Sequence, residues 1–439
     1  MRDIIITVMV FGLLPFILRN AWYGVLAWSW LSYMNPHRLA WGFAQTMPFA
    51  QIVALVLLFS LIFNKESKKL PFNSLIFVWA AFLVWNVVCT FFAFYPENAA
   101  EGLEQVLKIQ LITFVTMMLM KNMERINQLI WVIVFSIGFY SVKGGIFTFM
   151  TAGAYHVYGP AGSYIMENNT FAVAVLMVIP LMIYVYRFPP HPLVKTIMPF
   201  CMFFSLVSVI GSQSRGALLA IGAVGGFFWL QSRAKVLTGI VFIFLAFFGY
   251  LFMPQDWHDR MSTITEYEED ASAMGRIKAW EYSINLANDR ITGGGFNNWS
   301  RENYAVYAPG ARQALVAHSI YFGVLGESGW PGLILFLTVL FLVWRQLGRI
   351  IALTRDDPDR SDCYFLARML KISMVAFMSG GAFLSLSYFD LAWHIMAMTV
   401  AMTQLLRSQV EQHPAPSRAG RVRRRRAPIA RGRRAPGRP

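Results

Sequence analysis

The chain has 439 residues, of which 56% are hydrophobic and only 14% are charged. A soluble globular protein carries about 25% charged residues, so this composition excludes a water-soluble enzyme. The net charge of +15 comes largely from ten arginines that follow Glu411, which argues against a nucleic-acid partner for the rest of the chain.

Long apolar runs recur along the chain, and each is a candidate transmembrane helix because about 20 apolar residues span a bilayer core as a helix. The first run is either one long broken helix or two short helices, so twelve or thirteen crossings result. The runs lie at residues 3–33, 48–63, 71–94, 102–120, 127–150, 167–187, 193–211, 216–231, 235–253, 317–345, 364–387 and 390–407.

Lysine and arginine in the short connections predict the orientation, because basic loops are retained in the cytoplasm. The connections at 64–69 and 121–125 are basic, whereas FYPENAAE and GAYHVYGPAGSYIMEN are not. This alternation places a long loop outside the cytoplasm and the C-terminus inside it. The predicted parts are transmembrane helices 1–253, the outer loop 254–316, C-terminal transmembrane helices 317–407 and a disordered Arg-rich tail 408–439, which we expect to be drawn to anionic membrane lipids.

The outer loop holds the most polar part of the chain. ASAMGRIKAWEYSINLAN predicts an amphipathic helix, and the glycine turn ITGGGFNNW follows it. The cluster EYEED at 266–270 offers carboxylates to a divalent ion, but we interpret it as a solvated face. The chain has no HExxH, P-loop or GxGxxG motif, and its three cysteines lack metal-ligand spacing, so no metal and no cofactor are predicted.

Three residues near the outer surface can carry chemistry: Arg215 in IGSQSRGALLA, Arg276 in the amphipathic helix and His318 in VAHSIYFG. An arginine at membrane depth needs an anionic partner, and histidine titrates near neutral pH. Each also has a structural alternative: an interfacial anchor for Arg215, an ion pair with Glu281 or another loop acid for Arg276 and a hydrogen-bonded structural histidine for His318.

Three more polar residues lie within apolar runs. Lys143 in YSVKGG either contacts a diphosphate or headgroup or extends to the interface. Asp390 and His394 are four residues apart and can form a proton pair in a transporter. We interpret them instead as capping or lining the last helix at the interface.

The SQSRG arginine, the GRIKAW helix, the GGGF turn and the H-S-x-Y...E-x-G-x-x-G stretch resemble the signature of bacterial O-antigen ligases and polymerases, over most of residues 160–345. The opening, from MRD to SYMNPHRLAWGFA, resembles O-glycosylation ligases of exosortase-containing bacteria. That second resemblance leaves the acceptor open between the lipid A core and protein.

The resemblance implies an all-α polytopic fold of the GT-C-like type in the inner membrane, with a large periplasmic loop. It also implies metal-independent transfer of a glycan from undecaprenyl diphosphate to the lipid A-core oligosaccharide, on the periplasmic side. Under this hypothesis Arg215 and Arg276 stabilise the diphosphate, and His318 is the general base of an inverting reaction. The expected substrate contacts are Lys143, Gly294, Gly295 and Tyr321.

Three alternatives stay open at this point. A protein O-glycosylation ligase and an O-antigen polymerase share much of this chemistry and differ in the acceptor. A polysaccharide flippase or transporter has a similar pattern of apolar runs, but it is expected to need charges near the bilayer midplane. Here the polar residues of interest gather at the outer face.

Overall fold

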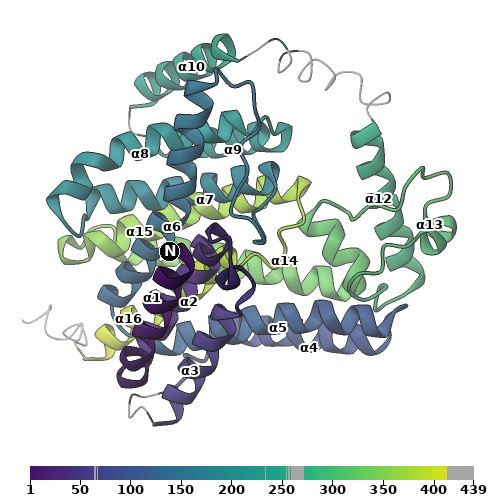
Figure 1. The fold of residues 1–439 in the computed structure, drawn as a ribbon, viewed down its shortest axis with the longest axis horizontal. Helices are drawn as coiled ribbons and strands as arrows, with labels where there is room; N and C mark the ends of the chain where they lie inside the picture. The colour runs from purple at the N-terminus through teal and green to yellow at the C-terminus, as the bar shows by residue number, and fades with distance from the viewer. Residues whose placement is uncertain are drawn as a thin grey trace, which may run out of the picture.

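The computed structural model describes residues 1–63, 66, 68–232, 234–253, 255, 258 and 271–412, and every regular element in this part of the chain is a helix. Figure 1 shows a bundle in which α4 and α5 run side by side along the lower edge. The helices α12 and α13 gather at one end, which we call the α12 end. The bundle confirms the predicted all-helical architecture.

Seven helices are long and apolar enough to cross a membrane, and α3 (Phe49–Phe63), α9 (Arg215–Gln231) and α10 (Lys235–Phe252) are shorter apolar helices. The expected count of twelve crossings is therefore not reached by length and composition among the described residues. The chain is a multi-pass helical membrane protein. Six of the seven spans are α4 (Ser74–Phe91), α5 (Pro96–Leu119), α6 (Met123–Met150), α7 (Asn168–Arg187), α8 (Pro192–Gly211) and α14 (Ile320–Thr354), and the seventh contains α15 (Ser361–Gly380) between η3 (Pro358–Arg360) and η4 (Gly381–Phe383).

The first apolar run forms two helices, which decides between the two predicted alternatives. Asn20 has an extended backbone and ends α1 (Arg2–Arg19), and its side chain accepts a hydrogen bond from the Trp22 N–H at the start of α2 (Ala21–Met34). Asparagine is a favourable N-cap because its oxygen satisfies one orphan amide. Two short helices, η1 (Pro36–Leu39) and η2 (Phe43–Thr46), lead from α2 to α3.

The centre of the bundle is α7, most of whose side chains are buried between α6, α8 and α15. The helices α6 and α8 approach closely at Gly145, where an added Cβ would lie 1.8 Å from the Phe204 carbonyl oxygen. Small residues allow such contacts between membrane helices, and the Ser141 and Ser205 hydroxyls are hydrogen-bonded across the same interface at 2.7 Å. The last helix, α16 (Asp390–Gln412), packs against α5, α14 and α15.

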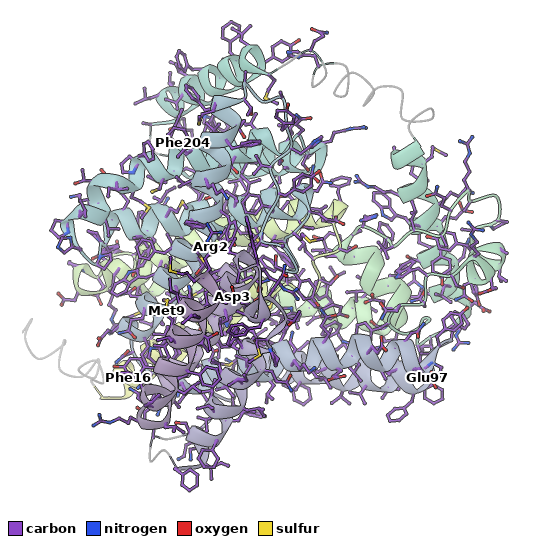
Figure 2. The ribbon with its side chains drawn as sticks, viewed as in Figure 1. Arg2, Asp3, Met9, Phe16, Glu97 and Phe204 are labelled. Atoms are coloured by element: carbon purple, nitrogen blue, oxygen red, sulfur yellow. The ribbon has the colours of Figure 1, made fainter. Side chains whose placement is uncertain are left out.

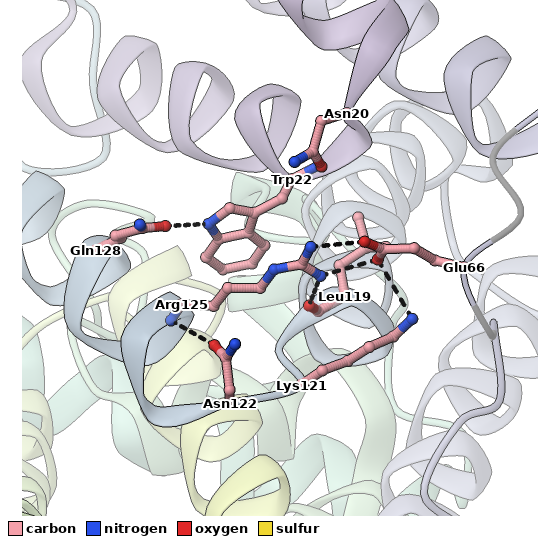
Figure 3. A network of polar contacts seen from close by, with 8 residues as sticks. All are labelled: Asn20, Trp22, Glu66, Leu119, Lys121, Asn122, Arg125 and Gln128. Atoms are coloured by element: carbon pink, nitrogen blue, oxygen red, sulfur yellow. Dashed lines mark hydrogen bonds and ion pairs between the residues drawn. The ribbon is translucent and has the colours of Figure 1, made fainter.

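A polar network ties together the end of the bundle opposite α12 (Figure 3). The Arg125 guanidinium donates to both carboxylate oxygens of Glu66 and to the Leu119 carbonyl oxygen, while Lys121 lies 3.3 Å from Glu66. Arg125 also lies over the ring of Trp22. The network therefore joins two of the predicted basic connections to the break between α1 and α2.

The α12 end has a small core of its own. The helix α12 (Ala271–Asp289) confirms the predicted amphipathic helix, and its Tyr282 ring stacks on Tyr304 of α13 (Arg301–Tyr307), with centroids 4.5 Å apart. The aromatic residues of this loop thus form a core under two helices. Glu97, near the start of α5, lies at the same end in Figure 2. The predicted EYEED cluster and the part of the predicted tail beyond residue 412 lie outside the described residues, whereas residues 408–412 of that tail form the end of α16 (Asp390–Gln412).

Candidate functional site

A polar cavity of about 330 Å³, here called cavity A, brings Arg215 and Arg276 together. It lies where the start of α7, the start of α9, α12 and η4 meet. The two arginines are 61 positions apart in sequence and line one cavity. The cavity is lined by Asn168, Asn169, Gln213, Ser214, Arg215, Gly216, Ala273, Arg276, Phe383 and Leu384.

The connection before α9 is held by hydrogen bonds that position Arg215. The Gln213 side chain donates to the Gly153 carbonyl oxygen at 2.8 Å, and Asn168 donates to the Ser212 carbonyl oxygen at 2.8 Å. Gln213 has a φ of +54°, a left-handed conformation that a non-glycine residue adopts only when its surroundings enforce it. These contacts place Arg215 as the first residue of α9.

The start of α9 favours an anion. Ser214 caps the helix by accepting from the Ala217 N–H, and the next residue is the arginine. A helix N-terminus carries partial positive charge and therefore disfavours a cation in its first turn. Arg215 adds a full positive charge there, and Arg276 adds a second across the cavity. An anionic ligand such as a phosphate would be stabilised by all three groups.

Arg276 is directed to this place by the packing of α12 on α14. One turn further along α12, the Trp280 indole donates to the Ala317 carbonyl oxygen at 2.9 Å and stacks on Phe322. Residues four apart share a helix face, so Arg276 lies on the same side as Trp280. Glu281, the alternative partner predicted for Arg276, instead pairs with Lys278 at 2.8 Å.

His318 directly precedes the N-cap of α14 and is partly buried. Its φ of +44° is left-handed, so the surrounding contacts determine where its ring points. Burial lowers the pKa of His318, the charge of Arg276 lowers it further, and Glu167 opposes the shift. The imidazole is therefore neutral at neutral pH and lies within electrostatic reach of Arg276, so all three predicted catalytic residues belong to one region.

The glycine turn packs against protein. The Gly294 N–H donates to the Gly326 carbonyl oxygen at 2.9 Å, and the Gly295 N–H donates to the Glu327 carbonyl oxygen at 3.0 Å. Gly295 has a φ of +79°, and an added Cβ would lie 2.3 Å from the Ala93 Cβ. Both glycines are buried and neither lines cavity A. Their conformation is explained by close packing of this turn on α14 and the α4–α5 connection.

Two other predicted substrate contacts lie away from cavity A. The Tyr321 hydroxyl donates to the Met378 carbonyl oxygen at 2.9 Å, which ties α14 to α15. Lys143 is exposed on α6 and lines a mainly apolar cavity of about 490 Å³ between α6, α7 and α8. The structure therefore gives Tyr321 a packing role and places Lys143 beside a lipid-facing groove.

The structure adds residues to the site and corrects one interpretation. Asn168 and Asn169 line cavity A, and the neighbouring Glu167 acts on His318; the only sequence signal was their place in a non-basic loop. Asp390 and His394 were expected at the interface, but they are 4% and 0% exposed. They lie inside the protein because α5, α14 and α15 pack around α16. Asp390 accepts from the Ser32 hydroxyl of α2, and His394 is hydrogen-bonded to Tyr33 of the same helix.

The fold and cavity A together define a multi-pass helical membrane protein with a cavity lined by two arginines at one end of its bundle. Residues 200–337 match the family described as O-antigen ligase, and this match contains Arg215, Arg276 and His318. This part of the chain is therefore similar to the O-antigen ligase family. Residues 1–189 match a family of unknown function, DUF5935. A comparison with curated proteins found no match.

Proposed function

We propose that this protein is an O-antigen ligase that transfers a glycan from undecaprenyl diphosphate to the lipid A-core oligosaccharide at the periplasmic face of the inner membrane. The observation that carries the proposal is cavity A, which Arg215 and Arg276 line within the matched ligase domain. His318 does not line this cavity, but it lies near enough to Arg276 for that charge to lower its pKa. The basic connections around Glu66 favour the cytoplasm for that end of the bundle and the periplasm for the α12 end.

The diphosphate of the donor occupies cavity A in this proposal. Negative charge grows on the diphosphate as its bond to the sugar breaks, and charge-assisted hydrogen bonds that strengthen in the transition state accelerate the reaction. Arginine holds its proton and binds phosphate oxygens bidentately. Arg215, Arg276 and the first amides of α9 supply this stabilisation, so the transfer needs no divalent cation.

His318 is the general base. The acceptor hydroxyl gives its proton to the neutral imidazole as its oxygen attacks the anomeric carbon, and the bond from that carbon to the phosphate oxygen breaks. Attack opposite the leaving group inverts the anomeric configuration. The lowered pKa of His318 keeps the imidazole unprotonated at neutral pH, which supports this role.

The polyprenyl chain of the donor lies against the lipid-facing side of the bundle. The mainly apolar cavity between α6, α7 and α8 supports this placement, because it offers side chains such as Phe139 and Met198 to a hydrocarbon chain. Lys143 lines the same cavity and can meet the charged head of the lipid.

The experiment is reconstitution of the purified protein with undecaprenyl-diphosphate-linked glycan and rough lipopolysaccharide in the presence of a chelator. We expect glycan transfer by the native chain and its loss in His318→Ala and in Arg215→Ala. A matched control is His191→Ala, because His191 is exposed at the start of α8 and outside cavity A.

Three results would contradict the proposal. Transfer abolished by the chelator would remove the metal-independent mechanism. Elongation of the lipid-linked glycan in place of its transfer would indicate a polymerase. Transfer that needs a protein acceptor would indicate a protein O-glycosylation ligase.

A further inference from the structure

A second cavity, of about 920 Å³, lies within the part of the chain that matches the family of unknown function. Here called cavity B, it is formed by α2, η1, the beginning of α3, the middle of α5 and residues 162–165, and it is completed by Phe389 and Asp390. It is larger than cavity A, and the reaction proposed above places no group in it.

One wall of cavity B is apolar and faces the membrane. It contains Leu55 and Leu58 of α3 and Leu111 and Ile112 of α5. Leu55 is 59% exposed and Leu111 is 48% exposed, although both helices are apolar. A hydrocarbon chain that lay along this wall would contact these side chains directly from the bilayer, so the wall suits the tail of a lipid.

The other end of cavity B carries positive charge. Arg38 on η1 is exposed, and within the described part of the chain its side chain makes no ion pair. Gly162, with a φ of +69°, passes so close that an added Cβ would lie 3.1 Å from the Arg38 Nε. The neighbouring His37 has a buried Nδ1 without a hydrogen-bond partner in the same part of the chain. A phosphate in cavity B would pair with the exposed Arg38 guanidinium.

Between these ends the lining is rich in groups that bind hydroxyls. Asp390 is 4% exposed and accepts from Ser32, while Gln51 and Gln105 add side-chain amides. The ring of Trp28 lines the same space. Carboxylate, amide and aromatic groups together bind a sugar through its hydroxyls and its apolar face. Tail, phosphate and sugar are thus the three parts of a phosphorylated glycolipid.

Cavities A and B are neighbours along two segments of the chain. Residues 162–165 line cavity B and residues 168–169 line cavity A; similarly, Leu384 lines cavity A and Phe389 lines cavity B. Phe389 lies five positions after Leu384, a span of at most roughly 18 Å. A glycan that began in cavity B would therefore reach the donor site within a few sugar lengths.

We propose that cavity B is the acceptor site and that it takes a phosphorylated glycolipid, with its phosphate at Arg38 and its hydrocarbon chain between α3 and α5. This inference rests on the proposed function. It implies that residues 1–189, which match the family of unknown function, bind the acceptor. A polypeptide acceptor fits cavity B poorly, because its backbone groups would be unsatisfied along the apolar wall.

The experiment measures transfer kinetics with phosphorylated rough lipopolysaccharide as the acceptor. We expect Arg38→Gln and Leu55→Trp each to raise the KM for the acceptor about tenfold, which corresponds to about 1.4 kcal/mol, with kcat and the KM for the donor unchanged. The controls are Arg301→Gln and Ile62→Trp, which alter an exposed arginine and an exposed α3 residue outside cavity B.

A second measurement needs no donor and no activity. Native mass spectrometry should show rough lipopolysaccharide bound to the native chain, with weaker binding of its dephosphorylated form and weaker binding to Arg38→Gln.

Equal acceptor KM values in Arg38→Gln and Arg301→Gln would overturn the proposal, as would a raised donor KM in Leu55→Trp. Equal competition by phosphatidylglycerol would also overturn it, because the site would then bind any anionic lipid. Absence of transfer with intact lipopolysaccharide binding would contradict the proposed function and leave the glycolipid site standing.

Discussion

Arg276 lies close enough to His318 for its positive charge to lower the pKa of the imidazole. Arg276 lies on α12, and His318 lies just before α14. The Trp280 indole of α12 donates to the carbonyl oxygen of Ala317, the residue before His318, and this hydrogen bond holds the two segments together. Under the proposed function, this arrangement couples the arginine that would stabilise the leaving diphosphate to the histidine that would accept the proton. The coupling can be measured.

Arg276→Gln should shift the pH dependence of transfer. Burial and Arg276 both lower the pKa of His318, so removal of the arginine raises that pKa and moves the acidic limb of the kcat/KM profile to higher pH. Glu167→Gln should move the limb the other way, because Glu167 raises the pKa of His318. Profiles of both variants over pH 5 to 9 test the two directions together.

The control for this pair is Lys278→Gln, which removes a positive charge from α12 where it pairs with Glu281. Its profile should match that of the native chain. An acidic limb that stays in place in both Arg276→Gln and Glu167→Gln would mean that His318 does not titrate in the reaction.

Arg215→Lys should separate charge from geometry. Lysine keeps the positive charge at the start of α9 but cannot bind two phosphate oxygens in a plane, so we expect kcat/KM to fall about tenfold. Arg215→Ala removes the charge as well and should lower kcat/KM by roughly 100-fold to 1000-fold, the range for the loss of one transition-state donor. Steady-state kinetics with the donor as the varied substrate distinguish the two. Equal losses in both variants would indicate that charge contributes nothing.

Much of this fold could be predicted because apolar runs of helix length are a strong signal in a membrane protein. The predicted run 167–187 became α7 at Asn168–Arg187, and 193–211 became α8 at Pro192–Gly211. The α13 helix was missed because seven residues with scattered aromatic side chains have no helical period to detect. The number of crossings depends on short helices such as α2, whose length alone does not decide whether they span a membrane.

The site was predictable in part. Arg215 was singled out because an arginine at membrane depth needs an anion, and Arg276 because the GRIKAW helix resembles the family signature; the two do share a cavity. Asn168 and Asn169 were missed because an amide in a polar loop has no distinguishing pattern. The glycine turn was assigned to substrate because GGGF resembles the family signature. Glycine permits close approach of any group, and here that group is Ala93 of the same chain.

Gly295→Ala should destabilise the protein by roughly 2–4 kcal/mol, because it combines a left-handed backbone with a Cβ 2.3 Å from Ala93. Thermal unfolding in detergent should show a lower Tm. Gly222→Ala is the matched control, since no atom lies within 4 Å of an added Cβ on this α9 glycine. An unchanged Tm with a raised substrate KM in Gly295→Ala would favour the original assignment of this turn to substrate.

Tyr321→Phe should leave the kinetics nearly unchanged. The variant loses the hydrogen bond to the Met378 carbonyl oxygen and about 1 kcal/mol of stability, but it keeps the ring that packs against the core. Unfolding curves and steady-state kinetics of the same preparation test both parts. A large rise in either KM without a change in stability would mean that the hydroxyl contacts substrate.

Arg125→Met should weaken the opposite end of the bundle. The variant removes a side chain that is 15% exposed and binds both Glu66 oxygens and the Leu119 carbonyl oxygen, so we expect a loss of roughly 2–3 kcal/mol in stability.

The hydrogen bond from Arg125 is the main cause that lowers the pKa of Glu66 from 4.5 to about 2. A carboxyl group with a lowered folded-state pKa stabilises the fold above its unfolded pKa, and this contribution disappears as the pH falls towards 2. The difference in Tm between the variant and the native chain should therefore be constant from pH 5 to 8 and shrink below about pH 4.

Lys108→Met is the control, because its pair with Glu104 is 66% and 64% exposed and should contribute less than about 0.5 kcal/mol. Equal Tm values for Arg125→Met and Lys108→Met would show that the network around Glu66 does not hold the α1–α2 break in place.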